Sequence, residues 1–340
     1  MICLGIESTA HTFGCSLVEY LPESRIRKGR ILSDRRDVFI PPEGTGIHPR
    51  EASRHHCEVA DRVLRSALKD ARLTTNDVNI VSFSAGPGLG PCLRVGAVVA
   101  RALAAFHDKP IVPVNHAVGH VELGSMLTGC RDPLVLLVSG GHTMILVFSS
   151  HRWRVFGETL DITLGQLLDQ FGRRIGFASP CGDRIEKLAR QSTGNYRSLP
   201  YMVKGNDVSF SGLLTSAIRA ISSDMGALAH AELSYSLQET AFAMITEAVE
   251  RALSFTSKPE FLIVGGVAAN RRLASMLKSA CRRLGSKFYI CPTKFAGDNG
   301  VQIAWTGMLE YSTNRKVVKV EEASVNQSWR IDQVDVPWRK

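Results

Sequence analysis

The chain has 340 residues, with 41 Lys and Arg against 32 Asp and Glu, a formal net charge of +9 and 44% hydrophobic residues. This length suggests about two domains, and the composition excludes a largely disordered or collagen-like chain. No apolar run reaches the roughly 20 residues of a membrane span, and the N-terminus lacks the basic start of a signal peptide. Eight cysteines without a CxxC pair indicate a reducing, cytoplasmic setting, and the basic excess permits a nucleic-acid partner.

The first 130 residues alternate between predicted strands and helices. Strands are expected over 2–7 and 14–20, on either side of a polar turn, followed by a helix over 49–68. A strand over 80–83, an Ala- and Val-rich helix over 93–106, a strand over 111–114 and a helix beginning near Asn115 complete this half.

From Pro133 the same pattern begins again. Strands over 134–138 and 144–148 flank a glycine turn, and a helix over 233–253, a strand over 261–264, a helix from about 270, a strand over 288–290 and a helix over 301–310 follow. Two halves that each begin with a hairpin predict a duplicated α/β architecture with a cleft between two lobes, divided near residue 130.

The sharpest chemical feature is a pair of histidines, His116 and His120. On a helix these residues lie on one face, so both imidazoles can reach a single metal ion. Chance is the alternative, because ten histidines spread at random often include such a pair. A metalloprotease is disfavoured, since the zincin motif requires Glu directly after the first His and this chain has Ala117.

A loop over residues 295–300 contains Asp298 between glycines. Such an Asp is commonly a helix N-cap or turn residue. It could instead complete a site of two histidines and one carboxylate, an arrangement favoured by Fe(II), with zinc as the competitor.

Two glycine-rich turns occur in the second half, at Gly140-Gly141 between two strands and at Gly265-Gly266 between a strand and a helix. Glycine lets backbone amides approach phosphate oxygens, although tight turns also need glycine for their own geometry. Neither a P-loop nor a dinucleotide-binding GxGxxG is present, so we expect a nucleotide cleft of another kind. A basic run, which also resembles a solvated face, suggests a surface for a phosphate backbone: Arg25, Arg27, Lys28, Arg30, Arg35 and Arg36.

Taken together, these motifs resemble the tRNA threonylcarbamoyladenosine transferase family in its archaeal/eukaryotic form, the catalytic subunit of the KEOPS complex. The resemblance covers nearly the whole chain. It rests on residues 5–14, 47–52, 115–120, 138–141, 168–171, 207–213, 265–270 and 297–300.

The resemblance implies an actin/hexokinase-like (ASKHA) fold of two mixed-sheet lobes. The lobes would span residues 1–130 and 131–297, with the helix after about 298 packing back on the first lobe and a C-terminal tail over 325–340. It also implies transfer of a threonylcarbamoyl group from threonylcarbamoyl-AMP to the adenosine that follows the anticodon, with release of AMP, in tRNAs that read codons beginning with A. A non-catalytic ATP-binding subunit or a small-molecule kinase of the same fold is the alternative.

The resemblance further implies a set of site residues and partners. The partners would be tRNA, the other KEOPS subunits and a separate small protein kinase, without a membrane. The cofactor would be one divalent metal, Fe(2+) ahead of Zn(2+), held by His116, His120 and Asp298. Residues expected to bind the adenylate are Val138, Ser139, Gly140, Gly141, Asp169, Gly182, Glu186, Gly265, Gly266 and Asn270.

Three positions depart from the pattern of the archaeal/eukaryotic form. Leu137 stands where that form usually has a Tyr able to bind iron, and His142 replaces the more usual Asn. Residues 180–183 read Pro-Cys-Gly-Asp in place of Pro-Gly-Gly-Pro, which adds the Cys181 side chain and the Asp183 charge beside the expected nucleotide.

Overall fold

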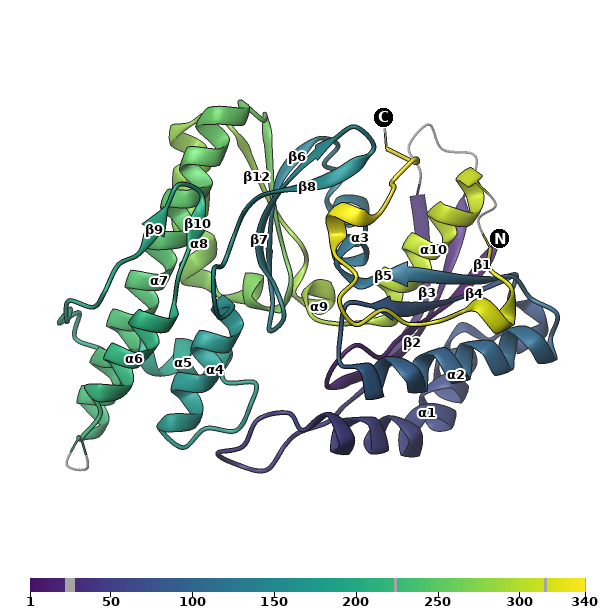
Figure 1. Ribbon diagram of the computed structural model, residues 1–340, viewed down its shortest axis with the longest axis horizontal. Helices are drawn as coiled ribbons and strands as arrows, with labels where there is room; N and C mark the ends of the chain where they lie inside the picture. Colours follow the sequence, from purple (N-terminus) through teal and green to yellow (C-terminus); the bar gives the residue numbers. More distant parts are fainter. Residues whose placement is uncertain (22–27, 223–224, 315–316, 340) are drawn as a thin grey trace.

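Two five-stranded sheets with the same strand order organise the chain (Figure 1). The computed structural model describes residues 1–21, 28–222, 225–314 and 317–339. In the first sheet, β1 pairs antiparallel with β2 and parallel with β4. On the outer sides, β2 pairs antiparallel with β3 and β4 pairs parallel with β5. Its strands, in the order β3-β2-β1-β4-β5, are β1 (Ile2–Glu7), β2 (Thr12–Leu21), β3 (Lys28–Val38), β4 (Ile80–Gly86) and β5 (Ile111–Asn115).

The second sheet repeats this topology strand for strand. β6 pairs antiparallel with β7 and parallel with β11, as β1 does with β2 and β4. This repetition confirms the predicted duplicated α/β fold. In the order β12-β11-β6-β7-β8, the strands are β6 (Pro133–Val138), β7 (Thr143–Ser149), β8 (Arg152–Glu158), β11 (Glu260–Val264) and β12 (Lys287–Ile290).

Sequence patterns missed the third strand of each sheet. β3 coincides with the basic run, and β8 alternates irregularly between exposed and buried positions. Both are edge strands, in which polar residues on the open side weaken the periodic signal. A two-stranded ribbon of β9 (Val203–Lys204) and β10 (Asp207–Val208) was also not expected.

Helices cover the sheets and bury a separate apolar core in each half. In the first half, α1 turns Ala52, Val59, Val63 and Ala67 toward the sheet at helical spacing. The helices of the first half are α1 (Pro49–Ala71), α2 (Gly90–Phe106) and the short η1 (Thr75–Asp77). Those of the second are α4 (Leu164–Arg174), α5 (Gly182–Ala189), α6 (Ser211–Arg219), α7 (Ala227–Thr256), η2 (Gly266–Ala269), α8 (Arg271–Arg283) and α9 (Thr293–Ala296).

Two further helices, α3 (His116–Thr128) and α10 (Gly300–Asn314), join the halves. α3 follows β5 but packs against β6 and β11, whereas α10 follows the second half and packs against β1, β2 and β4. The helices also pack on each other, within a third core shared by both sheets. Gly5 on β1 permits the closest approach, because a Cβ atom there would lie 2.2 Å from the Ala304 nitrogen and the Gly300 oxygen.

The C-terminal segment crosses both halves (Figure 1). It includes η3 (Val320–Glu322) and η4 (Ile331–Gln333). The Asn326 N–H donates to the Ala85 carbonyl, and the Val336 N–H donates to the His151 carbonyl. Arg339 pairs with Glu122 on α3 and lies over the Trp153 ring, 4.7 Å from its centroid. The predicted limits of the two lobes and of the tail stay predictions.

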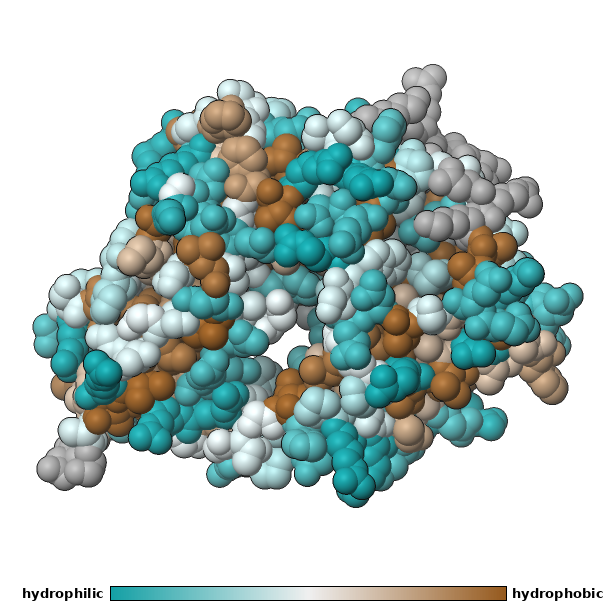
Figure 2. All heavy atoms as spheres, viewed as in Figure 1, coloured by the Kyte–Doolittle hydropathy of each residue, from teal (hydrophilic) through white to brown (hydrophobic). Residues whose placement is uncertain are grey.

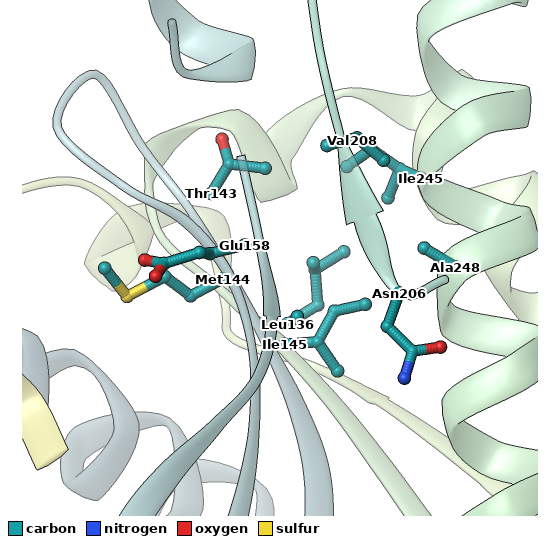
Figure 3. Close-up of a pocket in the computed structure, with 10 residues that line it drawn as sticks. Leu136, Thr143, Met144, Ile145, Glu158, Asn206, Val208, Ile245 and Ala248 are labelled. Atoms are coloured by element: carbon teal, nitrogen blue, oxygen red, sulfur yellow. The ribbon is translucent and has the colours of Figure 1, made fainter. Parts of the chain in front are cut away.

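A small apolar gap lies within the second half. The residues drawn in Figure 3 surround an apolar gap between β6, β7, β10 and α7 of only about 10 Å³. A single water needs at least this volume, so the gap is too small for a ligand. Among the described residues, no helix has the length and apolarity that crossing a membrane requires.

We expect Gly5→Ala to destabilise the protein by about 1–3 kcal/mol, because overpacking must displace the α10 backbone rather than a flexible side chain. Urea unfolding of the full chain measures this. Gly212→Ala is the matched control, since a Cβ atom there would meet nothing within 4 Å. Equal stability of the two variants would contradict the packing described for β1 and α10.

Candidate metal and nucleotide site

The two histidines occupy the first two turns of α3. Asn115 caps this helix, because its Oδ1 accepts hydrogen bonds from the Ala117 and Val118 N–H groups. The cap ends β5 and starts the helix at His116, so His120 lies one turn further on the same face. The two rings are 4.6 Å apart between centroids and both are buried.

Asp298 reaches the same point from the other half of the chain. The neighbouring Asn299 caps α10 by accepting the Gln302 N–H, and its Nδ2 donates to the Phe295 and Gly297 carbonyls. Asn299 therefore does the capping work that is common for an Asp in such a loop. The Asp298 carboxylate is left to face the histidines.

The three side chains converge on a small volume. The Nε2 atoms of His116 and His120 are 3.2 Å apart, and Asp298 Oδ1 lies 3.4 and 3.3 Å from them. One ligand atom from each residue falls within 4.8 Å of the others. The spacing of metal-binding side chains is thus satisfied by residues nearly two hundred positions apart in sequence.

Sequence patterns did not assign a role to the groups behind His116. Glu7, at the end of β1 and fully buried, places its Oε2 atom 2.9 Å from His116 Nδ1. Its other oxygen accepts hydrogen bonds from the Thr9 N–H and hydroxyl. Gln302 on α10 places its side-chain amide 3.1 Å from the same Nδ1 atom. An acid directly after an apolar strand was the available signal for Glu7.

The charges in this cluster are strongly coupled. Burial by itself lowers the pKa of His116, but Glu7 and Asp298 outweigh it and raise the pKa to about 10. Burial lowers the pKa of His120. Burial opposes ionisation of Asp298, yet the two imidazoles hold its pKa well below the ordinary value. In the absence of another cation, His116 therefore carries the positive charge between two carboxylates.

The predicted glycine turns lie beside this cluster. A Cβ atom on Gly265, whose φ is +95°, would lie 2.2 Å from the Val138 carbonyl oxygen, so the two turns are in contact. Ser139 closes the hairpin turn by accepting the Gly141 and His142 N–H groups on its Oγ. Gly266 approaches Gly297, the residue before Asp298. Gly140 and Gly141 are exposed.

The remaining predicted nucleotide residues form a second group between α4, α5 and α8. Asp169 accepts the Cys181 N–H just before Gly182 begins α5, and Glu186 accepts the Arg271 N–H at the start of α8. Asn270 caps α8 with its Oδ1 and donates its Nδ2 to Gln238. The Glu186 and Asn270 side chains are thus engaged within the protein, and their contact with a nucleotide stays a prediction.

The residues that depart from the family pattern have clear surroundings. Leu137 is fully buried within β6 and offers no ligand. His142 stacks on His116 with 6.3 Å between ring centroids. Burial, together with the neighbouring imidazoles, lowers the pKa of His142 to about 3, so it is neutral at physiological pH. Cys181 is buried and donates to backbone carbonyls.

Most of the described part of the basic run is neutralised by local acids. Arg30 pairs with Glu19 and Arg35 with Asp70. Arg36 has another role, because it pairs with Asp34 and donates to the Lys294 and Asp298 carbonyls. It thereby anchors the loop that carries the site carboxylate. Arg25 and Arg27 lie outside the described residues.

The comparisons with known proteins identify the family. The model of the TsaD family, tRNA N6-adenosine threonylcarbamoyltransferase, matches residues 30–305. A protein of that name from Staphylothermus marinus is 46% identical over 98% of this chain and 99% of its own length. Another from Sulfurisphaera tokodaii is 46% identical over 100% of this chain and 99% of its own length. The chain belongs to the tRNA N6-adenosine threonylcarbamoyltransferase family. It acts as a transferase on tRNA, as the motifs predicted.

Other similarities fit this family and the fold. A probable bifunctional tRNA threonylcarbamoyladenosine biosynthesis protein from Methanothermobacter thermautotrophicus is 47% identical over the whole chain, which spans 61% of that relative. Among solved structures, HypF from T. kodakarensis superposes with a TM-score of 0.60 at 12% identity, covering 90% of this chain and 47% of HypF. An activator of 2-hydroxyisocaproyl-CoA dehydratase from Clostridium difficile gives 0.51 at 12% identity, covering 94% and 98%. These structural likenesses support the transferase's ASKHA-type fold alone.

A buried histidine next to the site predicts acid sensitivity. His56 on α1 bonds through Nε2 to the Ala10 carbonyl, in the turn that follows Glu7, and burial lowers its pKa to about 4. Because the unfolded chain protonates near 6.5, stability is lost as the pH falls from 6.5 to 4, by about 2 kcal/mol at pH 4.5. Urea unfolding of the wild type and His56→Gln at pH 7 and 4.5 should show a smaller acid loss in the variant. Equal losses, or the same effect from His230→Gln, would contradict this assignment.

Proposed function

We propose that His116, His120 and Asp298 bind one divalent metal ion, Fe(2+) in preference to Zn(2+), and that threonylcarbamoyl transfer depends on it. The carrying observation is the convergence of three ligand atoms within 4.8 Å of one another. Two histidines and one carboxylate form the donor set that non-haem Fe(II) favours. With both imidazoles neutral, Asp298 and the adjacent Glu7 carry two negative charges, which a divalent cation balances.

Glu7 fixes the tautomer and the orientation in which His116 would bind the metal. A proton on Nδ1 is donated to the Glu7 carboxylate 2.9 Å away, which leaves the Nε2 lone pair directed at His120 and Asp298. Such a carboxylate partner fixes the tautomer and orientation of a ligating imidazole. Glu7 therefore acts as a positioning residue, and the Gln302 side-chain amide on α10 donates to the same Glu7 oxygen over 3.5 Å.

The donor we propose is threonylcarbamoyl-AMP, and the acceptor is the exocyclic amine of the adenosine next to the anticodon. That amine is a weak nucleophile because its lone pair is conjugated with the ring, so the acyl group must arrive activated as a mixed anhydride. The exposed turn at Gly140 and Gly141, held in contact with Gly265, would orient the AMP part of the donor. A bound divalent ion supplies Lewis-acid polarisation of a carbonyl or phosphate oxygen.

The assembly in which the chain works is also a proposal. We expect it to function in the cytoplasm as part of a KEOPS complex, with its other subunits and a separate small protein kinase. The resemblance to the archaeal/eukaryotic form supports this, as do the archaeal relatives that match the chain over almost its whole length. Co-purification of these partners from the source cell tests it.

Activity should depend on the metal-binding triad. In the presence of its complex partners, tRNA and threonylcarbamoyl-AMP, the protein should release AMP and modify tRNA, and His116→Ala should lower the rate at least a hundredfold. His142→Asn should retain most activity, since His142 lies near the triad without belonging to it. Full activity of His116→Ala would remove the metal from the mechanism. Transfer of a γ-phosphate from ATP would instead favour a kinase.

Glu7→Gln should weaken metal binding 10- to 100-fold without removing a ligand, because a neutral amide holds the His116 proton less firmly. Titration of the metal-free protein with Fe(2+) under anaerobic conditions, followed by metal analysis, measures the affinity. Circular dichroism checks that the variant is folded. Glu51→Gln, an exposed substitution on α1, is the control of equal charge change. Unchanged affinity in Glu7→Gln would contradict the positioning role.

A further inference from the structure

A groove of about 580 Å³ opens on the second half, away from the proposed metal site. α6 forms one wall and the segment over 197–200 the other. Two arginines, Arg197 and Arg219, line it together with the hydroxyl-bearing residues Ser211, Thr215 and Ser216. A lining of guanidinium and hydroxyl groups is suited to anionic oxygens.

The two arginines are available to a ligand. Both are exposed, and neither makes a salt bridge with an acid in the described parts of the chain. Arg251 and Arg272 on the neighbouring helices α7 and α8 are instead paired with Glu247 and Glu239. The groove therefore concentrates positive charge that no salt bridge within the described residues balances.

Two tyrosines flank the same segment. The Tyr196 hydroxyl lies 2.9 Å from Thr240 Oγ1, and the Tyr201 hydroxyl donates to Glu247, both on α7. These bonds anchor the far end of each ring, yet the two residues remain 50% and 47% exposed. Anchored, half-exposed aromatic rings beside basic groups form the surface on which unpaired bases stack.

A short chain of hydrogen bonds connects the groove to the proposed nucleotide site. The Asp161 carboxylate accepts from the Ser209 hydroxyl and from the Phe210 and Ser211 N–H groups, at the start of α6. Two residues further on, the Thr163 hydroxyl donates to the Gly140 carbonyl in the glycine turn. α4 and α6 pack together, and they lie at the same end of the second half (Figure 1). A polynucleotide with one base at the proposed nucleotide site would therefore extend over the surface formed by α4 and α6.

We infer that this groove binds the sugar-phosphate backbone of the tRNA substrate close to the base that reacts. The inference rests on tRNA being the substrate, as the family establishes, and it does not require the metal. Arg197 and Arg219 would each contact a phosphate, and the α6 hydroxyls would add hydrogen bonds without reading the base sequence. We favour tRNA over an acidic protein segment because the family acts on tRNA and because the start of α6 is linked to the glycine turn of the proposed nucleotide site.

Salt-dependent binding of a tRNA transcript to the full chain tests this inference. Fluorescence anisotropy is measured without donor from 50 to 300 mM salt for the wild type and for the Arg197→Ala/Arg219→Ala double variant. We expect the double variant to bind about tenfold or more weakly, with a salt slope smaller by about 1.4, since each single-strand phosphate contact contributes about 0.7. Arg197→Lys/Arg219→Lys should keep most of the slope because the charges remain.

The matched control removes two exposed arginines elsewhere, in Arg94→Ala/Arg282→Ala, and should retain the wild-type affinity. Equal losses in both double variants, an unchanged slope in the groove variant, or no tRNA binding by the wild type would overturn the inference. Binding of polyglutamate by the wild type, lost in the groove variant while tRNA binding is kept, would also overturn it in favour of a protein partner. In turnover, the groove variant should raise the KM for tRNA and leave kcat unchanged, whereas failure of the metal proposal would appear in kcat and metal content.

Discussion

Close contact between α10 and β1 is the constraint on which the site depends. The helix backbone lies directly against Gly5, where no side chain could be accommodated. That contact brings the start of α10, with Asp298 and Gln302, beside Glu7 at the end of β1. α3 packs on α10 in turn, so the two histidines meet the carboxylate across a joint between the two sheets. The site therefore forms because α3 follows the first half and packs on the second, whereas α10 follows the second half and packs on the first.

Burial makes the polar cluster at this joint costly unless its charges are matched. Glu7 is fully buried, Asp298 has 15% of its side chain exposed, and His116 lies between them. Removing one member of such a group leaves an uncompensated charge in a low-dielectric interior. A bound divalent cation would balance the cluster with both imidazoles neutral. A balancing cation would thus explain why Glu7 and Asp298 occupy a position between the sheets where apolar side chains could otherwise pack.

The fold alone does not decide the chemistry. HypF and the dehydratase activator share this fold at only 12% identity, and one fold can support different functions. In this chain, Thr163 and Asp161 link the glycine turn to the start of α6, which lines the basic groove. A small activated donor and a large polynucleotide acceptor could then be held by separate features. Figure 2 shows the molecule hollowed between its two halves on the face drawn there.

The sequence by itself predicted the duplicated alternation of strands and helices, the start of α3 and the residues proposed to bind a metal. Its periodic strands and glycine turns are local signals, and so is the spacing of His116 and His120 on one helical face. It could not show that Asn299 rather than Asp298 caps α10, that Arg36 holds the Asp298 loop, or that Glu7 stands behind His116. Arg36 and Asp298 are 262 positions apart and Glu7 and His116 are 109 apart, whereas the Asn299 cap depends on the path of the loop itself. β3 and β8 were missed because edge strands lack a clean alternation. Tertiary packing alone decided the contacts of Arg36 and Glu7, because they depend on how closely the helices approach the sheets. No local sequence pattern encodes that distance.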